Sequence, residues 1–125
     1  MADRKLNSTY SRNEQVITDC DLTYAIHIIG GRWKLQILSS LKNQKMRFTD
    51  LKKKYALITE RMLTLQLRAM EKDGLIKRVV YAEVPPRVEY ELTELACRLT
   101  PILDQLSDWG QTHKHQTENK NEDKQ

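Results

Sequence analysis

The sequence has little glycine, proline or cysteine: its 125 residues include 4 Gly, 3 Pro and 2 Cys. It also lacks any apolar run near the ~20 residues that a membrane-spanning helix requires, so no membrane segment is expected. Residues 1–8 carry charges without a hydrophobic stretch behind them, and a secretory signal is therefore not expected. The length suits one domain with a modest core, to which dimerisation would add buried area.

The usual residue patterns of enzymes and metal sites are missing as well. Cys20 and Cys97 lie far apart, form no CxxC pair and have no histidine at metal-ligand spacing. We therefore expect no metal site, and reduced thiols in a cytoplasmic environment. His27, His113 and His115 do not cluster with carboxylates, and no nucleophile motif or phosphate-binding loop is present. Neither an enzyme nor a bound cofactor is expected.

What the chain does have is a strongly uneven distribution of charge. The net charge is only +4, but residues 32–78 contain 13 Lys or Arg against 4 acidic residues, a net charge of +9. Residues 79–110 reverse the sign, with 2 basic and 6 acidic side chains, a net charge of −4. This asymmetry favours one surface that meets a polyanion, although a solvated lysine-rich surface would give the same count.

The two ends of the chain read as tails. Residues 1–18 are polar without a sustained period, and residues 111–125 contain no large apolar side chain. Neither segment can bury enough surface to offset the entropy lost on ordering. We therefore predict a flexible N-terminal tail at 1–18, one folded domain at 19–110 and a disordered polar tail at 111–125.

Within the predicted domain, helical and extended patterns alternate in a defined order. A pair of helices followed at once by a two-stranded hairpin is typical of a winged helix-turn-helix, a mainly α fold with a small β-hairpin. The predicted elements are a helix ending at Gly30, a helix over 33–41, a short strand at 46–48, a helix capped by Thr49, a helix over 60–73, strands at 76–83 and 88–93, and a helix over 94–109.

The helix at 60–73 is the predicted reader of the major groove. At about 100° per residue, Leu63, Leu67 and Met70 share one face, which we expect to be buried. Arginine on the opposite face can pair with guanine, and a threonine hydroxyl can reach a phosphate or base edge. An ordinary amphipathic helix with a solvated charged face is the alternative. The candidate DNA contacts of this helix are Thr59 at its N-cap, Arg61, Thr64, Leu65, Arg68 and Lys72.

The hairpin at 77–92 would be a wing that meets the DNA backbone or the minor groove. Arg87 is predicted to stand at the tip of its proline-stiffened turn, and Lys77 and Arg78 at the hairpin base are further candidates. Three lysines at 52–54 precede the predicted recognition helix. We expect one of them, Lys53, to contact DNA.

Four segments carry a resemblance to a known family: GGRWK at 30–34, RMLT with QLR at 61–68, DGLI at 73–76 and YAEVPPRVEYELTE at 81–94. In these segments the chain resembles the HxlR-type winged helix-turn-helix transcriptional regulators, which are related in fold to the MarR group. The hairpin stretch is the most specific of the four.

This resemblance covers residues 20–110 and implies a cytoplasmic, homodimeric regulator of double-stranded DNA, acting as repressor or activator near its own genes. Carried over by position, it assigns the recognition residues Arg61, Thr64, Leu65 and Arg68 and the wing residue Arg87. At Leu65 the family often has a polar or basic side chain instead, which affects the expected base preference.

The resemblance also gives Cys20 a meaning, because some family members sense oxidants or electrophiles through a cysteine just before the first helix. Here Asp21 follows, where the family usually has proline. The charge of Asp21 disfavours a thiolate, whereas the nearby helix N-terminus favours it. A small structural residue at the dimer interface is the alternative for Cys20.

A dimer is also indicated by apolar surface that one small domain cannot hide. A two-fold pair would place two recognition helices about 34–36 Å apart, which matches successive major grooves. A plain intramolecular core is the alternative for part of this surface, and a winged-helix protein–protein interaction module is the alternative for the whole protein. The candidate dimer residues are Leu22, Ile26, Leu99, Ile102, Leu106 and Trp109.

Overall fold

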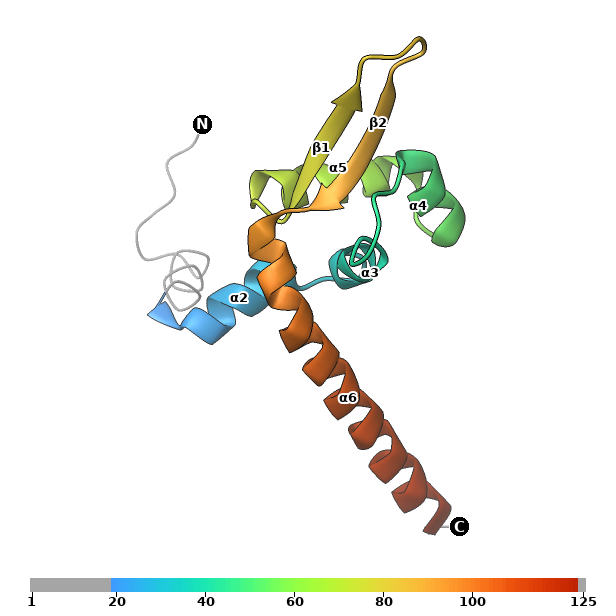
Figure 1. Ribbon diagram of the computed structural model, residues 1–125. Helices are drawn as coiled ribbons and strands as arrows, with labels where there is room; N and C mark the ends of the chain where they lie inside the picture. The colour runs from blue at the N-terminus through green and yellow to red at the C-terminus, as the bar shows by residue number, and fades with distance from the viewer. Residues whose placement is uncertain (1–18, 124–125) are drawn as a thin grey trace, which may run out of the picture. The chain divides into compact units, whose positions relative to one another are not determined.

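A computed structural model of the chain describes residues 19–123. The predicted N-terminal tail at 1–18 lies outside the described residues. The chain divides into two compact units, residues 1–37 and 38–125. Figure 1 shows the described elements, which are α2 (Asp21–Ile29), α3 (Lys34–Ser40), α4 (Phe48–Lys54), α5 (Glu60–Lys72), β1 (Ile76–Tyr81), β2 (Arg87–Leu92) and α6 (Glu94–Asp123).

In the first unit, α2 ends at the predicted place. The backbone N–H of Gly30 donates to the carbonyl oxygen of Ile26 at 2.6 Å and closes the last turn. Gly30 has φ −70°, so a left-handed backbone is not the reason for glycine here. Close approach is the reason, because a Cβ at Gly30 would lie 2.5 Å from the same carbonyl oxygen.

The second unit has a core built mainly from the helix-turn-helix and the base of the hairpin. Its α5 buries the three residues that helical spacing predicts for the inner face. The hydrophobic effect of this burial fixes which side of α5 stays in solvent. The buried apolar residues of this unit are Leu38, Leu41, Leu51, Ile58, Leu63, Leu67, Met70, Leu75, Ile76 and Ala96.

The two helices of the helix-turn-helix begin in different ways. Thr59 is the N-cap of α5, as predicted, and its Oγ1 accepts a hydrogen bond from the N–H of Met62 at 3.1 Å. The prediction that Thr49 caps the preceding helix is wrong, because α4 begins at Phe48 and its N-cap residue is Arg47. The Asp50 carboxylate accepts from the N–H of Arg47 at 3.1 Å, so an acid inside the first turn replaces the predicted threonine cap.

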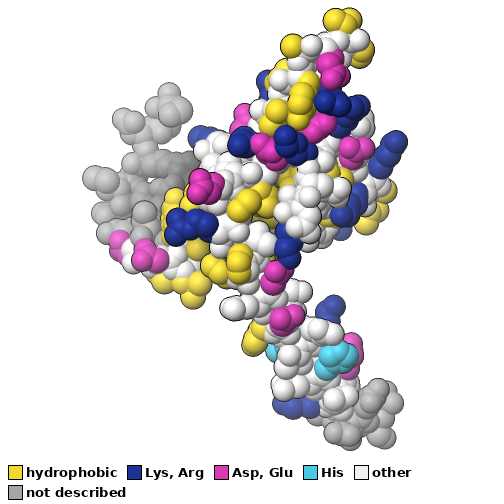
Figure 2. Space-filling view, viewed as in Figure 1, with side chains coloured by type: hydrophobic (Ala, Val, Ile, Leu, Met, Phe, Trp, Pro, Cys, Tyr) yellow, Lys and Arg dark blue, Asp and Glu magenta, His cyan; other side chains and the backbone are white. Residues whose placement is uncertain are grey.

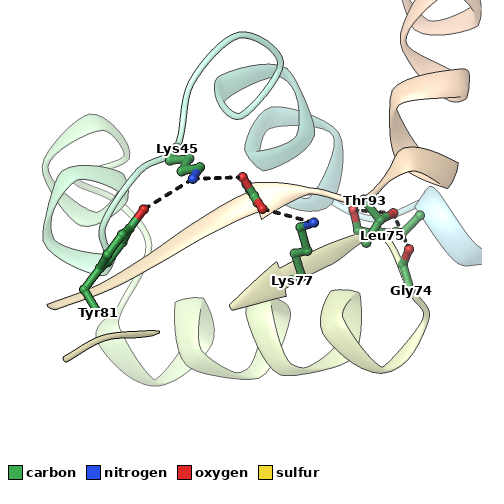
Figure 3. A network of polar contacts seen from close by, with 7 residues as sticks. Lys45, Gly74, Leu75, Lys77, Tyr81 and Thr93 are labelled. Atoms are coloured by element: carbon green, nitrogen blue, oxygen red, sulfur yellow. Dashed lines mark hydrogen bonds and ion pairs between the residues drawn. The ribbon is translucent and has the colours of Figure 1, made fainter. Parts of the chain in front are cut away.

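The hairpin pairs β1 with β2 in antiparallel register, from Ile76 opposite Leu92 to Tyr81 opposite Arg87. Thr93 closes its base: the hydroxyl donates to the Gly74 carbonyl at 2.6 Å and accepts from the N–H of Ala96 at 3.2 Å. Figure 3 shows Thr93 reaching the Gly74–Leu75 backbone from the end of β2.

The predicted short strand at 46–48 is reduced to a single bridge. Met46 and Tyr90 exchange two backbone hydrogen bonds, at 3.1 and 2.8 Å. Phe48 already belongs to α4. The strand cannot lengthen because the α4 helix starts immediately after the bridge.

The last helix is longer than the sequence predicts. Helix α6 continues through Gly110 to Asp123, so the predicted disordered tail is wrong for residues 111–123. Residues 111–121 are exposed, but a helix satisfies its own backbone groups without burial. Local contacts add to it: the hydroxyl of Thr112 donates to the Asp108 carbonyl at 3.1 Å, and that of Thr117 donates to the His113 carbonyl at 2.9 Å. Between residues 19 and 123, no helix is both long and apolar enough to cross a membrane.

Candidate nucleic-acid interface

The outer face of α5 carries cations that have no partner within the described chain. Arg61, Arg68 and Lys72 are exposed, and no hydrogen bond or ion pair engages their side chains among residues 19–123. Leu65 lies on the same face and is 50% exposed. Thr64 is half-buried, and its hydroxyl donates to the Glu60 carbonyl at 2.8 Å, which leaves the oxygen to accept. This face therefore presents guanidinium and ammonium groups that are free to meet an anion.

The three lysines of α4 differ in what surrounds them. The Nζ of Lys52 lies 3.5 Å from the carbonyl oxygen of Ala56, to which it donates, and Lys54 lies 5.9 Å from the centre of the Tyr55 ring. Lys53 is exposed and has no such contact among the described residues. A DNA contact by Lys53 stays a prediction.

The structure places Arg87 differently from the prediction. It is the first residue of β2, opposite Tyr81, and not the tip of the turn. Its guanidinium lies 4.2 Å from the centre of the Tyr81 ring. Its Nη2 is 3.5 Å from Glu83 and its Nε is 3.4 Å from Glu89, without hydrogen-bond geometry at Nε. These contacts occupy the charge that was predicted to face DNA.

The end of the hairpin is apolar instead. Val84 is fully exposed, and Pro85 and Pro86 are exposed beside it. Figure 2 shows yellow side chains over this end of the hairpin, with dark-blue ones nearer the base. A cation was predicted at the tip because Arg87 follows two prolines. In the structure the turn ends before Arg87, which pairs with Tyr81 in the strand ladder.

Neighbouring cations of β1 point to opposite faces of the hairpin. Lys77 Nζ lies 3.2 Å from Glu91, whose other oxygen is 3.5 Å from Lys45. Lys45 also donates to the Tyr81 hydroxyl at 3.3 Å, which completes the network in Figure 3. The hydrogen bond from Lys77 lowers the pKa of Glu91, and the contact with Tyr81 raises the pKa of Lys45, so both groups keep their charges at neutral pH. Lys77 is thus paired within the hairpin, where it shares Glu91 with Lys45.

Arg78 lies on the other face, opposite Tyr90 in the ladder. Both side chains line a pocket shared with α5, which also contains Arg68. Sequence reasoning missed Tyr90 and did not separate Arg78 from Lys77. The alternation of side chains along a strand was the available signal, because it puts adjacent residues on opposite faces.

The candidate dimer residues are largely exposed, as an interface requires, and they belong to two helices, α2 and α6. Leu22 and Ile26 are exposed on α2 in the first unit. On α6 of the second unit, Ile102, Leu106 and Trp109 are 59%, 45% and 64% exposed, and Leu99 is half-buried. Spacings of three and four residues put the α6 members in one stripe. Their role as an interface stays a prediction.

Cys20 is the exposed N-cap residue of α2. A hydrogen bond from the Thr23 side chain lowers the pKa of its thiol, and the opposing effect of Asp21 is the smallest contribution. The expected influence of Asp21 is therefore outweighed by a residue that sequence reasoning did not consider. In the described part of the chain, no group of three His, Cys, Asp or Glu side chains could hold a metal ion.

Comparison with known proteins identifies the family. A family model described as HxlR-like helix-turn-helix matches residues 28–118. The chain belongs to the HxlR-like helix-turn-helix family. The winged helix and the helix-turn-helix regulator class predicted from the sequence are thereby confirmed.

Relatives and solved structures agree with this membership. The chain is 46% identical over 114 residues to the HTH-type transcriptional regulator YdeP of Bacillus subtilis (strain 168), covering 91% of this chain and 88% of that protein. It is 48% identical over 103 residues to an HTH-type transcriptional regulator of Methanothermobacter thermautotrophicus, covering 82% and 79% of the two chains. The structure is similar to the redox regulator HypR in its reduced form, with a TM-score of 0.75, 40% identity, and coverage of 80% and 99%.

Proposed function

We propose that this HxlR-family protein is a cytoplasmic transcriptional regulator that binds double-stranded DNA as a homodimer, with α5 in the major groove. The observation that carries the proposal is the division of α5 into two faces. Leu63, Leu67 and Met70 anchor one face in the core, while Arg61 and Arg68 on the other face have no ion pair with any residue of 19–123. Such cations supply both the phosphate attraction and the base contacts that a recognition helix needs.

The test compares two variants that lose the same charge. Arg61→Ala/Arg68→Ala removes two cations from α5, and Lys114→Ala/Lys120→Ala removes two exposed cations from the far part of α6. Binding is measured on a duplex from the upstream region of the protein's own gene and on a scrambled duplex. We expect the α5 variant to lose at least tenfold in affinity for the upstream duplex and to lose discrimination between the two. The α6 variant should retain both.

Two results would count against this assignment. An α5 variant that stays folded and dimeric and binds unchanged would show that another surface reads DNA. A wild-type protein that binds neither duplex, even at low salt, would favour a winged-helix module that binds an acidic protein. A regulator should instead show a log–log salt slope of several units, because each phosphate contact contributes about −0.9.

The homodimer is supported by the exposed stripe on α6, whose contiguous apolar side chains need a cover in water. Leu106→Glu with Trp109→Glu should give a monomer in sedimentation equilibrium and weaken DNA binding. Gln111→Glu adds a charge on the opposite side of the same helix and should leave the dimer intact. A dimer that survives the double substitution would move the interface elsewhere.

Redox or electrophile sensing through Cys20 is supported by its exposure and by the lowered pKa of its thiol. A thiolate is the reactive form of cysteine, so this thiol is prepared for oxidation or alkylation. We expect a mild oxidant or a quinone to change DNA affinity in the wild type and to have no effect in Cys20→Ser. If both proteins respond equally, or neither responds, Cys20 is structural.

A further inference from the structure

A pocket lies between α5 and the hairpin, on the face of the hairpin that carries Arg78. Its volume is about 260 Å³. In Figure 1 the helix α5 crosses behind the lower part of the paired strands. The lining of the pocket comes from both elements and consists of Thr64, Leu67, Arg68, Glu71, Arg78 and Tyr90.

The lining groups are suited to an anion. The lining contains two guanidiniums, Arg68 and Arg78, and one carboxylate, Glu71, so the pocket carries an excess of positive charge. No ion pair engages any of these three side chains within residues 19–123, which leaves the arginine donors available. Arginine presents a planar fork of donors that matches the geometry of phosphate oxygens.

Tyr90 adds a neutral donor to the two cations. Burial raises the pKa of its hydroxyl, and nearby Arg78 acts in the opposite direction. The group therefore keeps its proton at neutral pH and can donate a hydrogen bond to an oxygen anion. Thr64 cannot add a further donor, because its hydroxyl already donates to the Glu60 carbonyl at 2.8 Å.

The lining of the pocket argues for a polar group. Pockets for drug-sized ligands hold about 300–1,000 Å³ and are lined mainly by apolar side chains. This pocket holds less, about 260 Å³, and five of its six lining residues are polar or charged. Its position also matters, since Thr64 and Arg68 belong to the candidate DNA surface of α5. A group that belongs to bound DNA can thus reach it.

We propose that the pocket between α5 and the hairpin seats one phosphate of the DNA backbone, held by Arg68, Arg78 and Tyr90. This inference rests on the proposed function and adds Arg78 and Tyr90 to the interface. A phosphate clamped by a strand residue and a helix residue fixes the hairpin relative to the recognition helix on the duplex. Such contacts set register and orientation and carry no base information.

Two residues that look equivalent in the sequence have different roles under this proposal. Lys77 and Arg78 are adjacent in β1, and each carries one positive charge. Lys77 is paired with Glu91 on the opposite face, 3.2 Å away, while Arg78 lines the pocket. A general electrostatic attraction would respond equally to the loss of either charge. A seated phosphate responds to Arg78 alone.

The experiment compares Arg78→Gln with Lys77→Gln, using the full chain and the upstream and scrambled duplexes over a range of salt. We expect Arg78→Gln to weaken both duplexes by a similar factor of about ten or more and to reduce the magnitude of the log–log salt slope by about 0.9. Lys77→Gln should change the slope little. If the wild type binds DNA and the two variants change the affinity and the salt slope equally, the proposed phosphate site is wrong. The proposed function would not be affected by that result.

Two further variants test the pocket from its other sides. Tyr90→Phe keeps the ring and should cost about two- to tenfold in affinity for both duplexes, as the loss of one hydrogen bond does. Glu71→Gln removes the only carboxylate of the lining and should tighten binding to both. Weaker binding in Glu71→Gln would mean that the pocket receives a cationic group, which contradicts the inference.

Inorganic phosphate distinguishes a DNA phosphate from a free anion. Replacing chloride by phosphate at constant ionic strength should leave DNA affinity unchanged, because the seat is used only by the duplex. Millimolar phosphate that binds in an Arg78-dependent way without displacing the duplex would make the pocket a small-anion site and overturn the assignment. If Arg78→Gln fails to fold by circular dichroism, Arg78→Lys replaces it. The lysine variant keeps the charge but loses the fork, so an affinity equal to that of the wild type would contradict a clamped phosphate.

Discussion

The guanidinium of Arg87 lies 4.2 Å from the centre of the Tyr81 ring, directly across the hairpin from it. The same guanidinium reaches Glu83 and Glu89, one on each side. Arg87 therefore joins both strands where the hairpin leaves its turn. The family resemblance assigns Arg87 to DNA, whereas its contacts in this chain are those of a residue that holds the wing in shape.

Replacing Arg87 by lysine should loosen the hairpin. The variant keeps the charge but loses the planar group that stacks on Tyr81, at a cost of about 1 kcal/mol in the free energy of unfolding. Hydrogen exchange of the β1 and β2 amides should become faster. Arg98→Lys, on the exposed surface of α6, is the matched control and should behave like the wild type. If hydrogen exchange of the β1 and β2 amides were unchanged, Arg87 would not stabilise the hairpin, and only its predicted DNA contact would remain.

Thr59 has a structural role as the cap of α5 and a predicted role as a DNA contact, and two substitutions separate these. Thr59→Ala should lower the free energy of unfolding by about 1 kcal/mol, because the hydrogen bond to Met62 N–H is lost. Thr59→Asp keeps a capping oxygen and should retain stability, since acids are favourable at a helix N-terminus. Its charge should nevertheless repel a phosphate. A DNA affinity that Thr59→Asp leaves intact would limit Thr59 to capping.

Gly110 lies within α6 without a structural need for glycine. A Cβ at Gly110 would meet nothing within 4 Å. Gly110→Ala should therefore raise helicity and stabilise the helix by about 0.5–1 kcal/mol. Gly30→Ala is the contrasting control, because its Cβ would lie 2.5 Å from the Ile26 carbonyl oxygen and should destabilise α2. Circular dichroism melts of both variants measure the difference, and a loss of helicity in Gly110→Ala would contradict it.

The Cys20 thiol should react unusually fast near neutral pH. In a Cys97→Ser background Cys20 is the only cysteine, so alkylation by iodoacetamide reports on it directly. Because the Thr23 hydrogen bond lowers the pKa of Cys20, the thiolate persists to a lower pH than in an ordinary cysteine. The pH–rate profile should therefore be shifted to lower pH, and Thr23→Ala should move it back upward. Identical profiles in the two proteins would remove Thr23 as the cause.

Much of the fold follows from patterns within single elements. The apolar spacing on α5, the threonine at its start and the glycine after its end are local, and they predicted that helix within one residue. The hairpin followed for the same reason, although its first strand is shorter than predicted, at 76–81, and its second strand lies one residue earlier, at 87–92. The sequence therefore supplied the helix-turn-helix and the wing before any packing was known.

The wrong or missing predictions concern features that depend on tertiary contacts or on where an element ends. Residues 111–123 have no apolar side chain to bury, which predicts disorder, yet their backbone hydrogen bonds close within the helix. The placement of Arg87 required the closing point of the turn, which only the strand pairing defines. Tyr90 joins Arg68 and Arg78 through the packing of the hairpin on α5, and no spacing along the chain reveals such a meeting.

The register of the hairpin has a consequence for how this protein can change over evolutionary time. Lys77 and Arg78 differ in role only because β1 alternates, so one residue inserted or deleted before them would exchange their faces without altering the composition. Thr93 at the base and the bridge between Met46 and Tyr90 pin the strands against such a slip. We therefore expect single-residue insertions at 75–76 to disturb both the packing of the hairpin base and DNA binding, while insertions in the turn at 82–86 leave the base contacts unchanged.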